Sequence, residues 1–199
     1  RAKAAGVQIE VVDDVRPLAV TAAPQGLVAR ARPITNHTLE ALIDPAPCLL
    51  VVLDHLEDPH NVGAIARSAM AAGATGLVLP VRRSAPLGPT AFKAAAGALE
   101  NLRISLQSST ADAVRRLKKL GVWTLGLTAG GGERLFDLPL LTEPIAIVVG
   151  SEGRGLGRLI EDRVDVRAHI PMVAGSESLN ASVAAALATY EAARVRKNL

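Results

Sequence analysis

The segment PHNVGAIARSAMAAGA, residues 59–74, decides how the rest of the sequence is interpreted. Ala, Val, Ile and Met fill most of its positions, which predicts a helix that is buried on nearly every side. Arg67 is the only charged residue between His60 and Arg82. A buried guanidinium keeps its charge and needs a carboxylate, carbonyl or phosphate partner. We therefore expect Arg67 to be buried and to face a crevice for an anionic ligand. The alternative is an Arg67 that reaches solvent along its aliphatic stem.

Apolar runs and helical patterns alternate around this segment. The expected strands are 49–53, 77–81, 122–127, 145–149 and a short one ending in AHIPM. The expected helices are 59–74, 89–100, 110–120 with Thr110 as N-cap, and 180–197. Continuous apolar runs of this length are typical of buried parallel strands. The alternation predicts an α/β fold, with a mostly parallel sheet and helices on both faces.

Composition narrows the class of protein. The chain has 199 residues, 49% of them hydrophobic, which suffices for one α/β domain and a remnant of another. Aromatic residues make up only 2%, which argues against RNA modules that stack bases on aromatic rings. Lys and Arg exceed Asp and Glu by 22 − 19 = 3, a balance that permits a nucleic-acid partner without requiring one.

The number of cysteines and the length of the apolar runs indicate the cellular compartment of the protein. A single cysteine, Cys48, rules out a disulfide or a cysteine-based zinc site within one chain, so we expect a cytoplasmic protein without a metal. No apolar run is long enough to span a membrane. The chain starts without Met or a signal-peptide pattern, so we expect a piece of a longer protein.

The chain is predicted to have three parts. Residues 1–33 alternate short apolar pieces with Pro and Gly and look like the tail of a small domain. Residues 34–47 form a linker with helical potential that is closed by Pro45 and Pro47. Residues 48–199 form the main α/β domain.

A second cluster, IAIVVGSEGRGLGRLI, spans residues 145–160. Its strand runs directly into a glycine-rich loop, where the backbone can turn sharply and a ligand can approach closely. The spacing does not match the G-x-G-x-x-G fingerprint, and no such fingerprint follows the first strand, which disfavours an NAD-dependent enzyme. The simpler alternative is a tight turn with a solvated Glu152.

A third cluster, IPMVAGSESLNASVAAALATYEAA, spans residues 170–193. A loop of small polar residues leads into Ser178-Leu179-Asn180 at the start of the last helix. That helix is apolar all round for three turns, which predicts that a second copy of the chain covers it. The simpler alternative makes Ser178 an ordinary N-cap and Asn180 a bystander.

Together the clusters carry the patterns Asn61-x5-Arg67, Gly150-x-Glu152-x-x-Gly155 and Ser178-x-Asn180. In this order, and at the ends of strands, they resemble the three motifs of the SpoU (TrmH-type) RNA ribose 2′-O-methyltransferases of the SPOUT superfamily. The resemblance covers the chain from about residue 49 to 196. The closest likeness is to bacterial enzymes that methylate a guanosine ribose of large-subunit (23S) ribosomal RNA. Enzymes acting on a guanosine of tRNA, and antibiotic-resistance rRNA methylases, are the alternatives.

The resemblance implies a fold and partners that the pattern alone does not give. It implies a deep trefoil knot in the carboxyl-terminal third, an exception to the rule that chains do not thread loops. It also implies S-adenosylmethionine as cofactor, RNA as partner, and a homodimer formed through the C-terminal helix. Residues 1–33 would be the end of an RNA-binding, ribosomal-protein-like domain, although Pro24 stands where the family often carries His.

The resemblance also assigns roles to individual residues. The catalytic set it implies is Asn61, Arg67, Glu152, Ser178 and Asn180. The cofactor-binding set is Thr128, Gly150, Ile170, Met172 and Leu179. The basic residues beside the first motif and the domain junction are candidates for RNA binding: Arg30, Arg32, Arg82, Arg83 and Lys93. Because a guanidinium is a poor base, we expect Arg67 to clamp a phosphate and stabilise a developing alkoxide. A non-catalytic RNA-binding protein is the rival from another class.

Overall fold

The computed structural model describes residues 2–21, 23–173 and 178–196, and the chain divides into two compact units. The first unit, Arg1–Pro33, contains two short 3-10 helices, η1 (Lys3–Ala5) and η2 (Arg16–Leu18). None of its described residues is buried. Arg30 and Arg32 are exposed on this unit. Its assignment to an RNA-binding domain stays a prediction.

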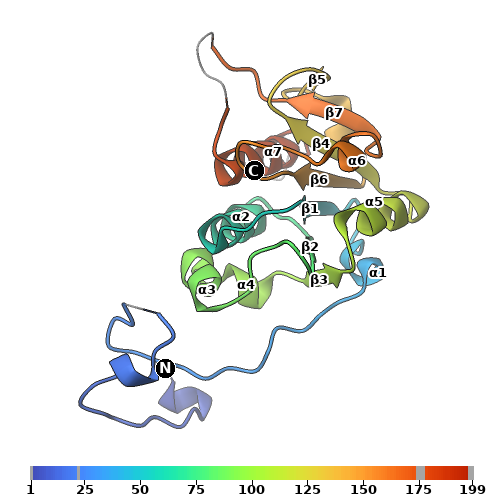
Figure 1. Cartoon of the computed structure of the whole chain (residues 1–199). Coiled ribbons are helices and arrows are strands. Elements are labelled where there is room, and N and C mark those ends of the chain that lie inside the picture. The colour runs from blue at the N-terminus through green and yellow to red at the C-terminus, as the bar shows by residue number, and fades with distance from the viewer. Residues whose placement is uncertain (1, 22, 174–177, 197–199) are drawn as a thin grey trace. The chain divides into compact units, whose positions relative to one another are not determined.

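The second unit, Ile34–Leu199, is built on a seven-stranded sheet in the order β3-β2-β1-β6-β4-β7-β5 (Figure 1). Its strands are β1 (Leu49–Leu53), β2 (Gly76–Pro80), β3 (Ile104–Gln107), β4 (Trp123–Thr128), β5 (Glu133–Arg134), β6 (Ile145–Val149) and β7 (Val166–His169). Every pair of neighbouring strands is parallel. The predicted α/β fold with a mostly parallel sheet is confirmed.

Helices cover both faces of the sheet, as predicted (Figure 1). The helices are α1 (Leu39–Leu42), α2 (Pro59–Ala71), α3 (Pro89–Ala95), α4 (Ala98–Asn101), α5 (Thr110–Lys119), α6 (Arg158–Glu161) and α7 (Ala181–Val195), with a 3-10 turn η3 (Pro139–Thr142). Side chains alternate along β1, so Leu49, Val51 and Leu53 pack with α2, α3, α4 and α7. The intervening Leu50 and Val52 pack with α1, α5 and α6.

Strands β1 and β6 are adjacent at the centre of the sheet although they are far apart in sequence. They pair in register from Leu49↔Ile145 to Leu53↔Val149, and the N–H of Asp54 extends the ladder to the carbonyl of Val149 at 2.8 Å. From β1 the chain continues toward β2 and β3, whereas the strands beyond β6 belong to the later half of the chain. This is a switch point of an open parallel sheet, where ligands bind beyond the carboxyl ends of the strands.

Helix α7 is anchored at its end by Arg196. The guanidinium of Arg196 donates to the carbonyls of Pro47 and Cys48 before β1 and of Leu141 and Glu143 before β6. Burial lowers the pKa of the Arg196 guanidinium. These hydrogen bonds tie the last helix to the amino ends of the two central strands.

Several predicted boundaries differ from the structure. The expected helix 89–100 is broken into α3 and α4, because Ala96 (φ 49°) and Gly97 (φ 95°) take left-handed conformations. The N-cap of α5 is Ser109, whose side chain accepts from the N–H of Asp112, rather than Thr110. Within residues 34–47, predicted as a linker, α1 packs into the second unit and its Leu39 and Leu42 are fully buried.

Two strands were not predicted. β3 lies at one edge of the sheet and β5, of two residues, at the other. Both are too short or too polar to give an apolar run in the sequence. The expected trefoil knot stays a prediction, since residues 174–177 of the third cluster lie outside the described part of the chain.

Close packing of α2 on α3 depends on Gly63. A Cβ at this position would lie 2.6 Å from the Cβ of Ala94 and 2.9 Å from the backbone N of Ala95. We predict that Gly63→Ala lowers the free energy of unfolding by about 1–3 kcal/mol, because the two helices must move apart. Thermal and denaturant unfolding of the purified chain measure this.

The matched control is Gly130→Ala. A Cβ at Gly130 meets nothing within 4 Å and its φ is not in the left-handed region, so this change should leave stability within about 0.5 kcal/mol. Equal stability of the Gly63→Ala and Gly130→Ala variants would contradict the packing described here.

Candidate functional site

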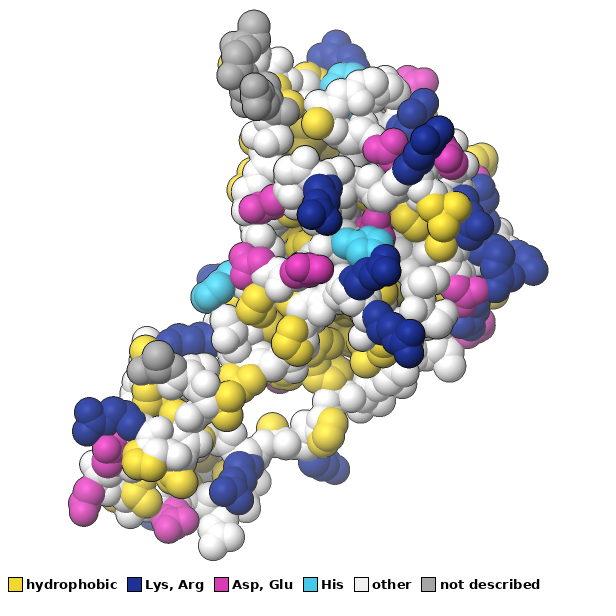
Figure 2. All heavy atoms as spheres, viewed as in Figure 1, with side chains coloured by type: hydrophobic (Ala, Val, Ile, Leu, Met, Phe, Trp, Pro, Cys, Tyr) yellow, Lys and Arg dark blue, Asp and Glu magenta, His cyan; other side chains and the backbone are white. Residues whose placement is uncertain are grey.

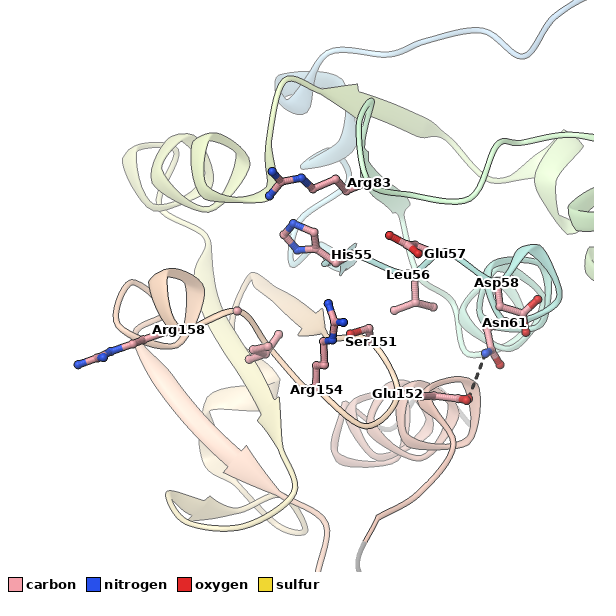
Figure 3. Close-up of a pocket in the computed structure, with 13 residues that line it drawn as sticks. His55, Leu56, Glu57, Asp58, Asn61, Arg83, Ser151, Glu152, Arg154 and Arg158 are labelled. Atoms are coloured by element: carbon pink, nitrogen blue, oxygen red, sulfur yellow. Dashed lines mark hydrogen bonds between the residues drawn. The ribbon is translucent and has the colours of Figure 1, made fainter.

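A cavity of about 810 Å³ opens where β1 and β6 end (Figure 3). It lies between the loop that joins β1 to α2 and the loop that joins β6 to α6. Its charged and polar lining residues are His55, Glu57, Asp58, Asn61, Arg83, Ser151, Glu152, Arg154 and Arg158. Figure 2 shows basic, acidic and histidine side chains gathered over the middle of the face in view. The cavity lies where a crevice was expected, beyond the end of the first strand, but Arg67 does not line it.

Three predicted catalytic residues, one from each motif, meet at one side of this cavity. The amide nitrogen of Asn61 donates to Oε1 of Glu152 at 3.0 Å. The amide nitrogen of Asn180 donates to Oδ1 of Asn61 at 3.0 Å and also to Oε1 of Glu152. The cluster joins residues 91 and 119 positions apart in sequence. Oε2 of Glu152 has no hydrogen-bond partner among the described residues and remains available to a ligand.

Local sequence fixes the position of each member of the cluster. Asp58 caps α2 by accepting from the N–H of His60 at 2.9 Å, and Pro59 occupies the first helical position. This places Asn61 in the first turn of α2, where the residue is buried, with 8% of its surface exposed. Asn180 is the N-cap of α7, since its Oδ1 accepts from the N–H groups of Ser182 and Val183. The interpretation of Asn180 as a bystander is wrong.

Glu152 stands at the tip of the glycine-rich loop. Ser151 and Gly155 exchange two backbone hydrogen bonds of 3.1 and 2.8 Å, which close the loop into a tight hairpin. A Cβ at Gly150 would overlap the backbone of Gly155, and Gly155 itself has φ +65°. The glycines are therefore required by the close approach of the two sides of the loop. Glu152 is exposed, but it is hydrogen-bonded as part of the cluster rather than simply solvated.

The predicted burial of Arg67 is wrong. Arg67 is exposed, and it makes no hydrogen bond or ion pair with any described residue. It shares the outer face of α2 with His60, Ala64 and Ala71, at intervals of seven, three and four residues. The apolar appearance of this segment comes largely from alanines, and two of them, Ala64 and Ala71, lie on the outer face. Arg67 is not part of the Asn61–Glu152–Asn180 cluster.

Ser178 is exposed and hydrogen-bonds to no described residue. It lies two residues before the N-cap of α7, so the structure places it close along the chain to Asn180 without joining it to the cluster. Its catalytic role stays a prediction.

The predicted cofactor residues lie at or after the carboxyl ends of three strands and just before α7. Thr128 ends β4, Gly150 follows β6 and Ile170 follows β7, and these three strands are neighbours in the sheet. Met172 is half-buried in the same loop as Ile170, and Leu179 precedes Asn180. None of these residues lines the cavity described above.

Two observations indicate that the predicted cofactor residues could hold a ligand with both polar and apolar parts. The backbone N–H groups of Gly150, Ile170 and Leu179 donate to no described residue. Nδ1 of His169, next to Ile170, is buried and lacks a partner among the described residues. Ile170 is 9% exposed and Leu179 packs against the main core, so apolar walls are present beside free polar groups. The residues present fit the predicted nucleoside cofactor.

The predicted RNA-binding residues are all exposed. Arg82 and Arg83 lie in the loop after β2, and Arg83 lines the cavity. Lys93 is on α3. Sequence reasoning missed Asp54, His55, Arg154 and Arg158 of the same site. The position of Asp54 and His55 directly after the first strand was the signal that could have found them.

Two further properties concern only the described part of the chain. No helix in it combines the length and the apolar character needed to cross a bilayer. The same residues contain no group of three or more His, Cys, Asp or Glu side chains arranged to hold a metal ion.

Comparison with known proteins agrees with these motifs. A sequence profile of the SpoU rRNA Methylase family matches residues 48–190. The chain belongs to the SpoU family. The resemblance on which the three motifs were assigned is thereby confirmed.

One relative in this family is an uncharacterized tRNA/rRNA methyltransferase of Synechocystis sp., 41% identical over 202 residues. The match covers 98% of this chain and 52% of the relative. This chain thus spans about half the length of that relative, and 55% of a mycobacterial one.

Solved structures of SpoU proteins share the fold. The SpoU methyltransferase AviRb from Streptomyces viridochromogenes, in complex with AdoMet, matches with a TM-score of 0.74 and 29% identity. That match covers 83% of this chain and 67% of AviRb. An RNA 2′-O ribose methyltransferase matches with a TM-score of 0.68 and 28% identity, over 88% of this chain and 62% of the other. The agreement confirms the SPOUT-type fold class of the second unit.

The hydrogen-bond cluster predicts the effect of changing Asn180 to Asp. An aspartate still caps α7, but it places a second carboxylate against Glu152 and removes a donor to Asn61. We predict that Asn180→Asp lowers the free energy of unfolding by about 1–3 kcal/mol, measured by denaturant unfolding.

The same change at Asn36 is the matched control. Oδ1 of Asn36 accepts from the N–H of Leu106, a role that an aspartate oxygen also performs, so Asn36→Asp should stay within about 0.5 kcal/mol. A stable Asn180→Asp variant would mean that the cluster is not held together in solution.

Proposed function

We propose that this chain transfers a methyl group from S-adenosylmethionine to a ribose 2′-hydroxyl of RNA, and that the target is a guanosine of large-subunit ribosomal RNA. The observation that carries the proposal is the hydrogen-bond cluster of Asn61, Glu152 and Asn180. One residue from each family motif contributes to it, and it borders a cavity at the carboxyl end of a parallel sheet. The likeness to a 2′-O ribose methyltransferase supports ribose as the acceptor.

The chain's own residues suit the two halves of this reaction. Thr128, Gly150, Ile170, Met172 and Leu179 would hold the cofactor, which supplies an electrophilic methyl group when bound. AviRb, a member of the same family, was crystallised with this cofactor. The glycine-rich loop contains Gly150 of this set and also residues that line the cavity, so one loop can contact both the cofactor and the RNA. Holding the two reactants in one orientation supplies a large part of such a rate enhancement.

Within the cavity, Glu152 is the natural contact for the ribose. Asn61 and Asn180 occupy Oε1 of Glu152 and hold the carboxylate in place, while Oε2 is free to accept a hydrogen bond from the 2′-hydroxyl. The exposed guanidinium of Arg67 has no internal partner and can bind an RNA phosphate. Arg67 would thus act from the outer face of α2 by clamping a phosphate that flanks the reacting ribose, with the proton of the hydroxyl leaving through water.

Arg67 variants test this function. With a large-subunit rRNA transcript, Arg67→Ala should reduce methyl transfer by about 100-fold or more, since it removes a charge contact made during reaction. Arg67→Lys should be faster than Arg67→Ala but slower than the wild type, because lysine keeps the charge and lacks the planar guanidinium. A tRNA transcript run in parallel distinguishes the two classes of RNA.

Equilibrium dialysis provides the control. The Arg67 variants should bind S-adenosylmethionine as tightly as the wild type, because Arg67 is not among the proposed cofactor residues, and the chain should not bind NAD. Arg163→Ala, which removes an exposed arginine outside the cavity, should transfer methyl groups at the wild-type rate. Full activity of Arg67→Ala would refute the assigned role, and a wild type that binds RNA without methylating it would favour a non-catalytic protein.

We also propose that the chain forms a homodimer through α7. Its outer face carries Val183, Leu187 and Tyr190, which are 45%, 38% and 42% exposed and spaced four and three residues apart. They form an apolar stripe on one side of the helix. Met70 of α2, the helix that packs against α7, is a further exposed apolar side chain. The helix is therefore apolar on its outer side as well as its inner side, as expected for one covered by a second copy.

Light scattering after size exclusion tests the dimer. The wild type should elute at twice the chain mass of 20.6 kDa, and Leu187→Glu should elute as a monomer, because a carboxylate in an apolar interface is costly. Leu159→Glu on α6, where the leucine is 54% exposed, should remain dimeric. A monomeric wild type would rule the interface out.

A further inference from the structure

Basic and acidic side chains line different sides of the cavity. His55, Arg83 and Arg154 lie together on one side in Figure 3, and Glu57, Asp58 and Glu152 lie on the other. Arg83 and Arg154 make no hydrogen bond or ion pair with any described residue. Glu152, by contrast, is engaged by two asparagines, and Asp58 caps α2. The basic side of the cavity thus has donors that the protein itself does not use.

Backbone strain is found at two of the three residues on the basic side, His55 and Arg83. His55 has φ +55° and Arg83 has φ +57°, in the left-handed region. This conformation costs roughly 1–2 kcal/mol for a residue with a side chain, and among such residues histidine adopts it more readily than arginine. His55 lies in the loop after β1 and Arg83 in the loop after β2, yet both side chains line the same cavity. Strained backbone that a fold retains is concentrated at ligand-binding sites.

A buried carboxylate holds His55 in position. The side chain of Asp54 is fully buried, and its Oδ1 lies 2.8 Å from Nδ1 of His55. Its Oδ2 accepts from the N–H of Gly157 at 2.9 Å, so both oxygens are fixed. The imidazole is 42% exposed, and the pairing of Nδ1 leaves Nε2 without a partner among the described residues. His55 is therefore an oriented hydrogen-bonding group at the surface of the cavity.

We propose that His55 and Arg83 form a binding site for a phosphodiester group of the RNA, next to the ribose that contacts Glu152. The inference rests on the proposed function, because that function places a ribose at the opposite side of the cavity. Each internal ribose of an RNA chain is flanked by phosphates, so a ribose at Glu152 brings a phosphate into the same space. The guanidinium fork of Arg83 binds two phosphate oxygens. Beside it, an imidazolium ring of His55, with hydrogen on both ring nitrogens, donates from Nδ1 to Asp54 and from Nε2 to the phosphate. Arg154 supplies further positive charge.

Binding of a short synthetic single-stranded RNA, measured without cofactor over a range of salt concentrations, tests the site. Arg83→Gln should weaken binding about tenfold and reduce the slope of log affinity against log salt by about 0.7, the value for one phosphate contact to a single strand. The control Arg115→Gln removes an exposed arginine of α5, ion-paired with Asp112, and should change neither quantity.

His55→Asn is the second variant. Asparagine tolerates the left-handed backbone and can donate to Asp54, so the fold should melt at the wild-type temperature. It lacks the imidazole Nε2, so RNA affinity should fall about fivefold. Weaker binding at an unchanged melting temperature supports a contact with RNA rather than a structural role.

The outcomes separate this inference from the proposed function. If the chain methylates RNA while both variants bind as tightly as the wild type, the phosphate site is wrong and the methyltransferase proposal stands. If Arg83→Gln binds more weakly at an unchanged salt slope, the contact is to a base rather than to a phosphate, which also overturns the assignment. If the variants lose RNA affinity as predicted while no methyl transfer is found, the phosphate site stands and the proposed reaction fails.

Discussion

The site depends on the parallel pairing of β1 with β6. These strands form a five-residue register at the centre of the sheet, and the ladder continues from Val149 to Asp54. The pairing sets the loop after β1 against the loop after β6, although nearly a hundred residues separate them in sequence. A one-residue slip would turn the side chains of β6 to the opposite faces of the sheet and displace Glu152 from Asn61. Burial fixes this register, because all ten residues of the two strands are buried.

The hydrogen-bond cluster builds on that pairing and extends it to α7. Asn180 serves two purposes, since its oxygen caps α7 while its nitrogen reaches Asn61 and Glu152. The start of the last helix is therefore coupled to the start of α2 and to the tip of the glycine-rich loop. At its other end, Arg196 ties the same helix to the carbonyls that precede β1 and β6. Both ends of α7 are thus fixed relative to the central strands that position the cavity.

Much of the architecture could be predicted from the sequence, because the central strands are continuous apolar runs. The expected bounds of the strands at 49–53 and 145–149 agree with β1 and β6. The edge strands β3 and β5 lack that signal, since an edge position does not require apolar residues on both faces. The largest error concerned Arg67. Alanine tolerates both the interior and the surface, so a helix rich in alanine does not reveal which side faces solvent.

The site itself was only partly predictable. Motif spacing identified Asn61, Glu152 and Asn180, but neither spacing nor composition indicated that they hydrogen-bond to one another. The Asp54–His55 pair and the approach of Arg83 depend on the left-handed backbone at two loop positions and on the order of strands in the sheet. Those are properties of the folded chain that a local sequence pattern does not encode.

The central claim is that the three motifs assemble a site for RNA ribose methylation. Its most direct test is a map of ribose 2′-O-methylation in total RNA from cells that carry or lack the intact gene. The account predicts that a single guanosine of large-subunit ribosomal RNA loses its methyl group when the gene is deleted and regains it when the gene is restored. Identical methylation maps with and without the gene would contradict it.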